Sequence, residues 1–195
     1  MKRLLQITLP LLFITSAVFP QSKANVNSLK EYGGKTFKVD DDEPYTGRVF
    51  DLNKSTGKKT LQGQYKNGLK TGKWTEWDKS GKKMKEVLYK NGMGQKLTSW
   101  WDNGKMRENQ NYKDELRNGI TTYWYKNGQK KGERPFKDGK EHGVYNRWYE
   151  NGQNKFVATF KNGDLIDCKY WDEDGNSCEC NVYDDGSYDL LNGCK

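Results

Sequence analysis

Aromatic residues recur along this chain at a fixed interval and divide it into short, similar segments. One column repeats every 23 or 24 residues, with each member four positions before a glycine, and comprises Trp77, Trp100, Trp124, Trp148 and Trp171. A second column keeps the same interval and comprises Tyr65, Tyr89, Tyr112, Phe136, Phe160 and Tyr183. A fixed interval of this length is typical of a repeat protein, in which one small unit is used again and again.

Two turn-like segments bound each aromatic stretch. Triplets such as Lys66-Asn67-Gly68 follow the second column, and triplets such as Asp102-Asn103-Gly104 follow the tryptophans. Asn-Gly and Asp-Gly are strong signals for tight hairpin turns, because these residues tolerate positive φ. We therefore expect an all-β protein: an elongated antiparallel meander of repeated β-hairpins, in which neighbouring units bury one another's rings.

The aromatic residues fall into two expected roles. Hydrophobic residues make up only 33% of the chain and aromatic residues 13%, so rings must supply much of the buried area, and the two columns are expected to form the core. Aromatics spaced three apart, such as Trp74 and Trp77, indicate either a bulge or an aromatic on each face. The more variable neighbours form a candidate binding surface of Trp74, Trp101, Tyr125 and Tyr149.

The first 24 residues differ from the repeats. Lys2 and Arg3 precede an apolar stretch that is short for a membrane span, and small residues follow at Ser22 and Ala24. This pattern predicts a secretory signal peptide at residues 1–24, with an uncleaved N-terminal anchor as the alternative. Residues 25–43 then form a lead-in, 44–176 an array of five to six hairpin units, and 177–195 a Cys-rich cap.

Four cysteines lie near the C-terminus, at Cys168, Cys178, Cys180 and Cys194. An even number in an exported chain predicts two disulfides, with three possible connectivities. Direct pairing of Cys178 with Cys180 would strain the residue between them, so each is expected to bond elsewhere. The alternative is a four-thiolate zinc site, although the C-x-C spacing is not the usual C-x2-C of such sites.

The charge narrows the class of partner. The formal net charge is +8, and Lys2, Arg3 and Lys23 would be removed with the signal peptide. A modest positive charge on an exported protein favours an acidic protein or an anionic envelope polymer as partner, and not nucleic acid. Lysines flanking the turns are expected to solvate an open sheet and to keep it from pairing edge to edge. The protein is not expected to be integral to a membrane.

The sequence offers little catalytic or metal-binding chemistry. His142 is the single histidine, and its turn position indicates a solvated residue in place of a catalytic base. The acidic stretch from Asp172 lacks the glycine and glutamate of a calcium loop, since Ser177 and Tyr183 stand at those positions. Asp40–Glu43 is expected to be a solvated lead-in.

Three glutamates, Glu86, Glu108 and Glu133, recur before the second column. Two carboxylates can serve glycoside hydrolysis, but recurrence in successive units favours a structural row. No catalytic residue, metal site or cofactor is predicted.

Two segments carry a family resemblance. Residues 65–77 and 148–155 resemble the MORN-repeat variant found in YwqK-type antitoxin proteins, and the pattern extends over roughly residues 44–176. The third unit departs from it, with Glu115 and Lys96 at positions where glycine is expected. The resemblance implies a non-enzymatic interaction scaffold that either neutralises a toxin by occluding it or binds an envelope component. The alternative hypothesis is a module that binds an envelope glycan or anionic polymer through lysines and exposed rings.

Overall fold

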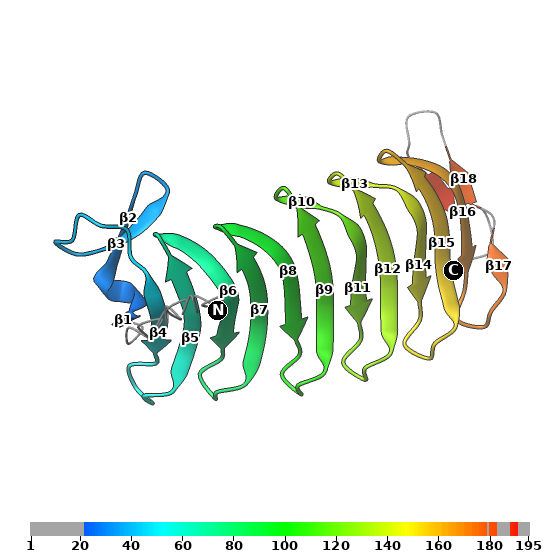
Figure 1. The fold of residues 1–195 in the computed structure, drawn as a ribbon. Helices are drawn as coiled ribbons and strands as arrows, with labels where there is room; N and C mark the ends of the chain where they lie inside the picture. The colour runs from blue at the N-terminus through cyan, green and yellow to red at the C-terminus, as the bar shows by residue number, and fades with distance from the viewer. Residues whose placement is uncertain (1–21, 179, 183–187, 191–195) are drawn as a thin grey trace, which may run out of the picture.

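The chain forms an elongated sheet of sequential hairpins. The structure is a computed structural model and describes residues 22–178, 180–182 and 188–190 (Figure 1). In this part of the chain the single helical element is the 3-10 turn η1 (Val26–Ser28). No helix among these residues has the length and apolarity to cross a membrane.

A group of three short strands lies at each end of the array. The lead-in comprises β1 (Lys23–Asn25), β2 (Leu29–Tyr32) and β3 (Lys35–Lys38), and the C-terminal end comprises β17 (Ser177–Cys178), β18 (Cys180–Val182) and β19 (Tyr188–Leu190). The strands between them are β4 (Gly47–Leu52), β5 (Lys59–Lys66), β6 (Leu69–Trp77), β7 (Lys83–Lys90), β8 (Met93–Trp100), β9 (Met106–Lys113), β10 (Leu116–Arg117), β11 (Gly119–Trp124), β12 (Lys130–Lys137), β13 (Lys140–Glu141), β14 (Gly143–Trp148), β15 (Asn154–Lys161) and β16 (Asp164–Trp171).

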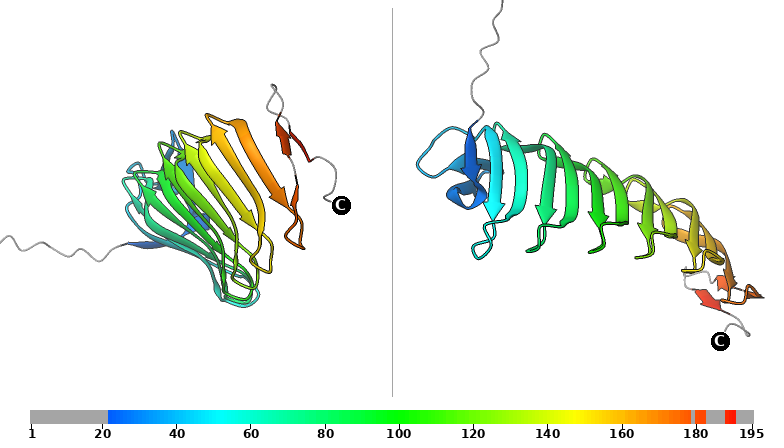
Figure 2. Two further views of the ribbon diagram at one scale, coloured as in Figure 1. Left: turned by 90° about the vertical axis from the view of Figure 1, so that its right-hand side faces the viewer. Right: turned by 90° about the horizontal axis from the view of Figure 1, so that it is seen from below.

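These strands pair mostly in the order in which they occur. A 15-stranded sheet runs from β1 and β4 through β16 to β17, and the short strands β10 and β13 pair with β9 and β12. Every pair along β4–β17 is antiparallel, whereas β1 lies parallel to β4. Figure 2 shows the result as a single, twisted row of bent strands. The predicted fold, an antiparallel meander of repeated hairpins, is therefore confirmed.

Each unit contains two different turns. The tight turn has two residues at positive φ, as in Asn67 (51°) with Gly68 (76°) and Asn91 (51°) with Gly92 (85°), which is the primed turn expected from Asn-Gly. The longer turn ends at a glycine of positive φ, as in Gly81, whose N–H donates to the Asp78 carbonyl at 3.0 Å. Both turns thus follow from the glycines that define the repeat.

Successive tight turns are joined by their backbones. The Gly92 N–H donates to the Lys70 carbonyl of the preceding unit at 2.9 Å, and the Gly163 N–H donates to the Glu141 carbonyl at 2.8 Å. A side chain at Gly92 would meet Leu69 at 3.4 Å, in addition to the strain of its positive φ. The tight turns at Gly92, Gly139 and Gly163 therefore each stack on the one before.

The sheet has two unlike faces. On the core face, Trp74 lies opposite Val87, and Val87 lies opposite Leu97. Rings on this face pack edge to face: the ring centroids of Tyr65 and Trp74 lie 5.0 Å apart, and those of Trp74 and Tyr89 lie 6.1 Å apart. The open face carries the alternate residues. The buried side chains lie largely on the core face, since the bent strands bring its rings against one another.

The core face is apolar at both ends of the array and polar in the middle. One buried cluster surrounds Val49 and Trp74, and the other surrounds Phe156 and Ala158. Between them lie the buried polar residues Ser99, Gln110 and Thr121. With its amide oriented to suit its neighbours, Gln110 donates to Glu108 and accepts from the Tyr112 hydroxyl and Arg117 Nε.

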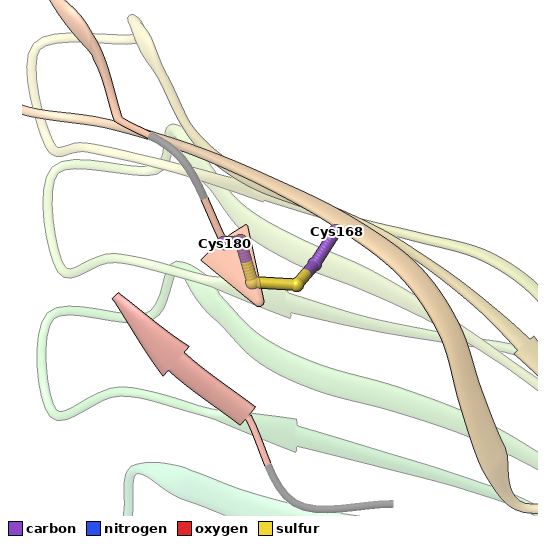
Figure 3. The surroundings of a disulfide bond; sticks show 2 residues. All are labelled: Cys168 and Cys180. Carbon is purple, nitrogen blue, oxygen red and sulfur yellow. A yellow bond between two sulfur atoms is a disulfide. The ribbon is translucent and has the colours of Figure 1, made fainter. Parts of the chain in front are cut away.

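A disulfide closes the C-terminal end. Cys168 on β16 is bonded to Cys180 on β18, as Figure 3 shows. This bond confirms that Cys180 pairs away from Cys178, which is also disulfide-bonded. Cys194 and Tyr183 lie outside the described residues. The half-buried Cys180 packs against the cluster around Phe156, so the bond holds the cap on the core face.

The N-terminal strand β1 reaches into the segment predicted to be a signal peptide. The Ser22 carbonyl accepts from the Arg48 N–H at 2.8 Å and from the Tyr45 hydroxyl at 3.1 Å. Ala24 packs against the cluster around Val49. Residues 22–24 are thus part of the sheet, while the rest of that segment lies outside the described residues.

Candidate interaction surface

The tryptophan column lies on the open face, beside the longer turns. In these units the antiparallel register shifts by one residue just before the tryptophan, as between Glu76 and Trp77 and between Arg147 and Trp148. Trp74, three residues before Trp77, lies on the core face. Both explanations for this spacing therefore hold: there is a bulge, and there is an aromatic on each face.

The rings of this column are half-buried, and lysine amines lie over some of them. Lys59 Nζ lies 5.6 Å from the centroid of Trp77, and Lys83 Nζ lies 4.9 Å from that of Trp100. Each of these lysines belongs to the unit before the ring that it covers, so the cation–π contact links neighbouring units. The second column lies on the core face instead, with Tyr65 and Phe136 buried and Tyr89, Tyr112 and Phe160 half-buried.

Three of the four candidate binding residues connect neighbouring units. Each follows a tryptophan of the column directly and donates to the carbonyl of the tryptophan in the next unit. The donor–acceptor distances are 3.1 Å from Trp101 Nε1 to Trp124, 2.8 Å from the Tyr125 hydroxyl to Trp148, and 2.8 Å from the Tyr149 hydroxyl to Trp171. These side chains are held by the fold, which limits what they can offer to a ligand.

Burial separates the four further. Trp74 is 6% exposed and Tyr149 is 7% exposed, so neither presents a free ring to a ligand, contrary to the expectation from sequence. Burial, followed by the hydrogen bond to the Tyr170 hydroxyl, raises the pKa of the Tyr149 phenol above its ordinary value. Sequence variability was the wrong criterion here, because it does not reveal on which face a ring lies. Trp101 and Tyr125 stay half-exposed.

The turn lysines do more than solvate the sheet, because several of them donate hydrogen bonds to the next turn. Lys58 Nζ donates to the Ser80 carbonyl in the next turn at 2.9 Å, and Lys82 Nζ donates to the Asp102 carbonyl at 2.7 Å. Lys105 donates in the same way to Asn127. These lysines bridge successive turns along one edge of the sheet, so their amines satisfy carbonyls that would otherwise face solvent.

The open face presents two rows besides the tryptophans. A polar row crosses the sheet in direct register and comprises Thr75, Glu86, Thr98, Asn109, Thr122, Glu133, Asn146, Val157 and Lys169. The next row holds exposed apolar side chains: Leu88 is 42% exposed, Ile120 54% and Val144 50%. Sequence reasoning missed this second row. Counting alternate positions back from each tryptophan would have found Ile120 and Val144.

The recurring glutamates do not form one cluster. Glu86 and Glu133 lie in the polar row, where Glu86 pairs with Lys73 at 3.6 Å and with Lys83 at 3.3 Å. Glu108 lies on the core face beside Gln110. The three side chains thus belong to opposite sides of the sheet and cannot act on one substrate together.

Other titratable groups serve the turns. His142 Nδ1 accepts from the Asn162 N–H of the next tight turn at 3.4 Å, and the Asp172 carboxylate accepts from Asp174 and Asn176 within its own turn. In the part of the chain that the structure describes, no group of three or more His, Cys, Asp or Glu residues is placed to hold a metal ion.

Comparison with known families agrees with the repeat geometry. Four segments match the family described as MORN repeat variant, at residues 70–91, 96–114, 117–138 and 141–162. Each segment begins just after a tight turn and ends in the next one. These four segments are similar to MORN-variant repeats. Because such repeats are generally non-catalytic and often mediate binding, the match supports a binding protein.

Two further comparisons add little. The sequence has no match among curated proteins. Among solved structures, the chain is similar to one described as the GtfA/B complex bound to UDP and GlcNAc, at 10% identity and a TM-score of 0.25. That alignment covers 68% of this chain and 22% of the other, so the chain spans about a fifth of that structure's length. No argument is drawn from this likeness.

Proposed function

We propose that this chain is an exported, non-enzymatic scaffold that binds another protein against the open face of its sheet. The observation that carries the proposal is the row of exposed apolar side chains on that face. Ile120 lies opposite Pro135, and Val144 takes the position of Ile120 on the strand that follows, so the three residues come from adjacent strands. The polar row separates them from the tryptophans. Contiguous apolar residues on a surface mark interaction sites.

Export is supported by the disulfide chemistry. The Cys168–Cys180 bond suits an oxidising compartment, as does the signal-like N-terminal sequence. Two kinds of partner fit an exported scaffold of this type. The resemblance to antitoxin proteins favours a toxin that the open face would occlude, and an envelope protein is the other. A toxin-like reading frame beside the gene would point to the first.

The non-enzymatic part of the proposal has its own support. Of the recurring carboxylates, Glu108 lies on the face opposite Glu86 and Glu133, and Glu86 and Glu133 lie on strands β7 and β12, which three other strands separate. His142 accepts a backbone hydrogen bond from the next turn. Catalysis requires such groups to converge on one reacting atom.

The test compares partner binding by matched variants. A partner captured from envelope extract is purified, and its complex with the chain is measured by light scattering. Ile120→Lys with Val144→Lys should abolish the complex, because lysine removes the apolar contact area. Lys73 and Lys96 occupy the same position in earlier units, so lysine is compatible with the fold there.

The control is Val39→Lys, which changes an exposed apolar residue outside the repeats and should leave the complex intact. A complex of defined stoichiometry that survives about 0.5 M salt supports an apolar protein interface, since screening weakens charge-driven binding. Equal binding by the double variant and the control would contradict the proposal.

A further inference from the structure

A hollow opens at the long-turn edge of the sheet, where three successive units meet. Its volume is about 390 Å³. Turn residues of the first unit, the paired indoles of Trp100 and Trp101, and Lys126 from the third unit line it, with Arg107 on β9. Of the cavities found among the described residues, this one lies within the repeats, whereas two others lie at the lead-in.

The hollow depends on residues that this unit alone combines. Directly after the tryptophan of the column, the other units carry Asp78, Tyr125, Tyr149 and Asp172, whereas this one carries Trp101. Two cations lie over the Trp101 ring: the Arg107 guanidinium carbon is 5.2 Å from its centroid, and Lys126 Nζ is 5.9 Å from it. Trp101 is fixed in turn by its bond to the Trp124 carbonyl. An aromatic-stacked guanidinium keeps its N–H donors free for a planar anion.

The acidic residues at the hollow are occupied by other groups. The Asp78 carboxylate accepts from the Ser80 hydroxyl at 2.6 Å and from the Lys82 N–H at 2.9 Å, and these bonds hold its pKa below the ordinary value. Asp102 pairs with Lys126 at 3.0 Å, and the hydrogen bond from Lys126 likewise lowers its pKa.

Positive charge is therefore in excess at the hollow. Lys82, Lys83, Arg107 and Lys126 line it with the two aspartates, and the described residues place no carboxylate within ion-pair distance of Arg107. Lys83 pairs with Glu86 at 3.3 Å, outside the lining. A guanidinium fork of this kind binds carboxylate or phosphate with two parallel hydrogen bonds.

We propose that this hollow binds an acidic sugar, with the carboxylate or phosphate on the Arg107 guanidinium and the sugar ring against the indoles. The two indoles in the lining favour a sugar over a simple anion or an acidic peptide, because the C–H face of a sugar ring supplies apolar contact that a free carboxylate lacks. The site is independent of the proposed protein interface, since it uses none of Leu88, Ile120 or Val144.

The test is a titration of the full mature chain by calorimetry with two probes, tetragalacturonic acid and a phosphorylated maltotetraose. Whichever of the two binds more tightly identifies the anionic group. Arg107→Ala should weaken binding about tenfold or more, through loss of a charge-assisted, bidentate contact. Arg107→Gln, which retains most of the side-chain length without the charge, should behave the same way. Both variants should keep the thermal midpoint, because Arg107 is exposed.

The matched control is Lys131→Ala. Lys131 takes the equivalent position one unit on and lies 5.4 Å from the Tyr125 ring, but it does not line the hollow. This variant should bind like the parent chain, and the neutral methyl ester of tetragalacturonic acid should not bind.

Three results would each overturn the site: neither acidic oligosaccharide binds, Arg107→Ala and Lys131→Ala weaken binding alike, or hexaglutamate binds as tightly as the sugars. None of them bears on the protein interface, which the Ile120 and Val144 variants test separately.

Discussion

At the scale of single residues, Thr121 and Glu115 are two of the positions where the side chain does not suit its surroundings or its backbone conformation. Thr121 is 1% exposed, and its hydroxyl has no hydrogen-bond partner among the described residues. Glu115 holds a φ of 64° in a tight turn, where the other units place glycine. A buried unpaired hydroxyl and a left-handed glutamate both cost free energy.

Thr121→Val should raise the free energy of unfolding by about 1 kcal/mol, because valine keeps the shape and removes the unpaired hydroxyl. Chemical denaturation measures the difference. The neighbouring Thr122 lies in the polar row of the open face and is half-buried, so Thr122→Val should change stability by much less. Equal effects at the two sites would show that the Thr121 hydroxyl is paired in solution.

Glu115→Gly should also stabilise the protein, by about 0.5–1 kcal/mol, because relief of the left-handed strain outweighs the greater freedom of glycine in the unfolded chain. The reciprocal change, Gly92→Ala, should destabilise it, since Gly92 has a φ of 85° and lies 3.4 Å from Leu69. Thermal denaturation of the two variants should therefore shift in opposite directions, and a shift in the same direction would refute the role of these turns.

At the scale of the element, the two-turn hairpin was readable from the sequence because its determinants are local. Asn-Gly and Asp-Gly pairs fix the tight turn by their positive φ, and the glycine four residues after each tryptophan fixes the other turn. The face of the sheet on which each aromatic side chain lies could not be predicted in the same way. Strand alternation places Trp77, three residues after Trp74, on the opposite face. Roles assigned by variability alone placed Trp74 and Tyr149 on a binding surface, although both are buried.

The hydrogen bonds from one unit to the next could not be predicted from the sequence, for a related reason. The Tyr125 hydroxyl reaches a backbone carbonyl 23 residues away, and a carbonyl carries no sequence signal. The hollow beside Trp101 likewise depends on side chains from three units, whose proximity follows only from the strand register.

The Tyr149 bond gives the array a dependence on pH. Burial raises the pKa of this phenol in the folded state, so its stabilisation is present below the unfolded value of about 10 and is lost as the pH rises through the folded value. The free energy of unfolding should therefore fall above about pH 10, and Tyr149→Phe should reduce that fall. Tyr32→Phe is the control, since Tyr32 is 80% exposed and should leave the pH profile unchanged.

At the scale of the whole molecule, neighbouring repeats stabilise one another, and a separate structure covers each end of the sheet. The Cys168–Cys180 bond holds the cap at one end, and β1 covers the edge of β4 at the other. Repeat arrays need such ends, because a terminal unit has a neighbour on one side only. How the chain is processed at its N-terminus therefore affects the fold.

A chain that begins at Val18 should have a higher thermal midpoint than one that begins at Asn25, because only the longer chain keeps Ser22 and Ala24 in the sheet. Cleavage after Ala17, which follows Thr15 and Ser16, would preserve β1, whereas cleavage after Ala24 would divide it. Mass spectrometry of the protein from its natural source identifies the natural N-terminus. An N-terminus at Asn25 with an unchanged midpoint would show that β1 is dispensable.

The backbone bond from a tight turn to a carbonyl of the preceding unit recurs at Gly92, Gly139 and Gly163, at different places along the row. Two strands advance the sheet by about 9.5 Å, so duplication of one unit in the gene would lengthen the protein by that step without disturbing the rest. The number of repeats therefore sets the length of the sheet, and gain or loss of a repeat would change the area of its open face in fixed steps.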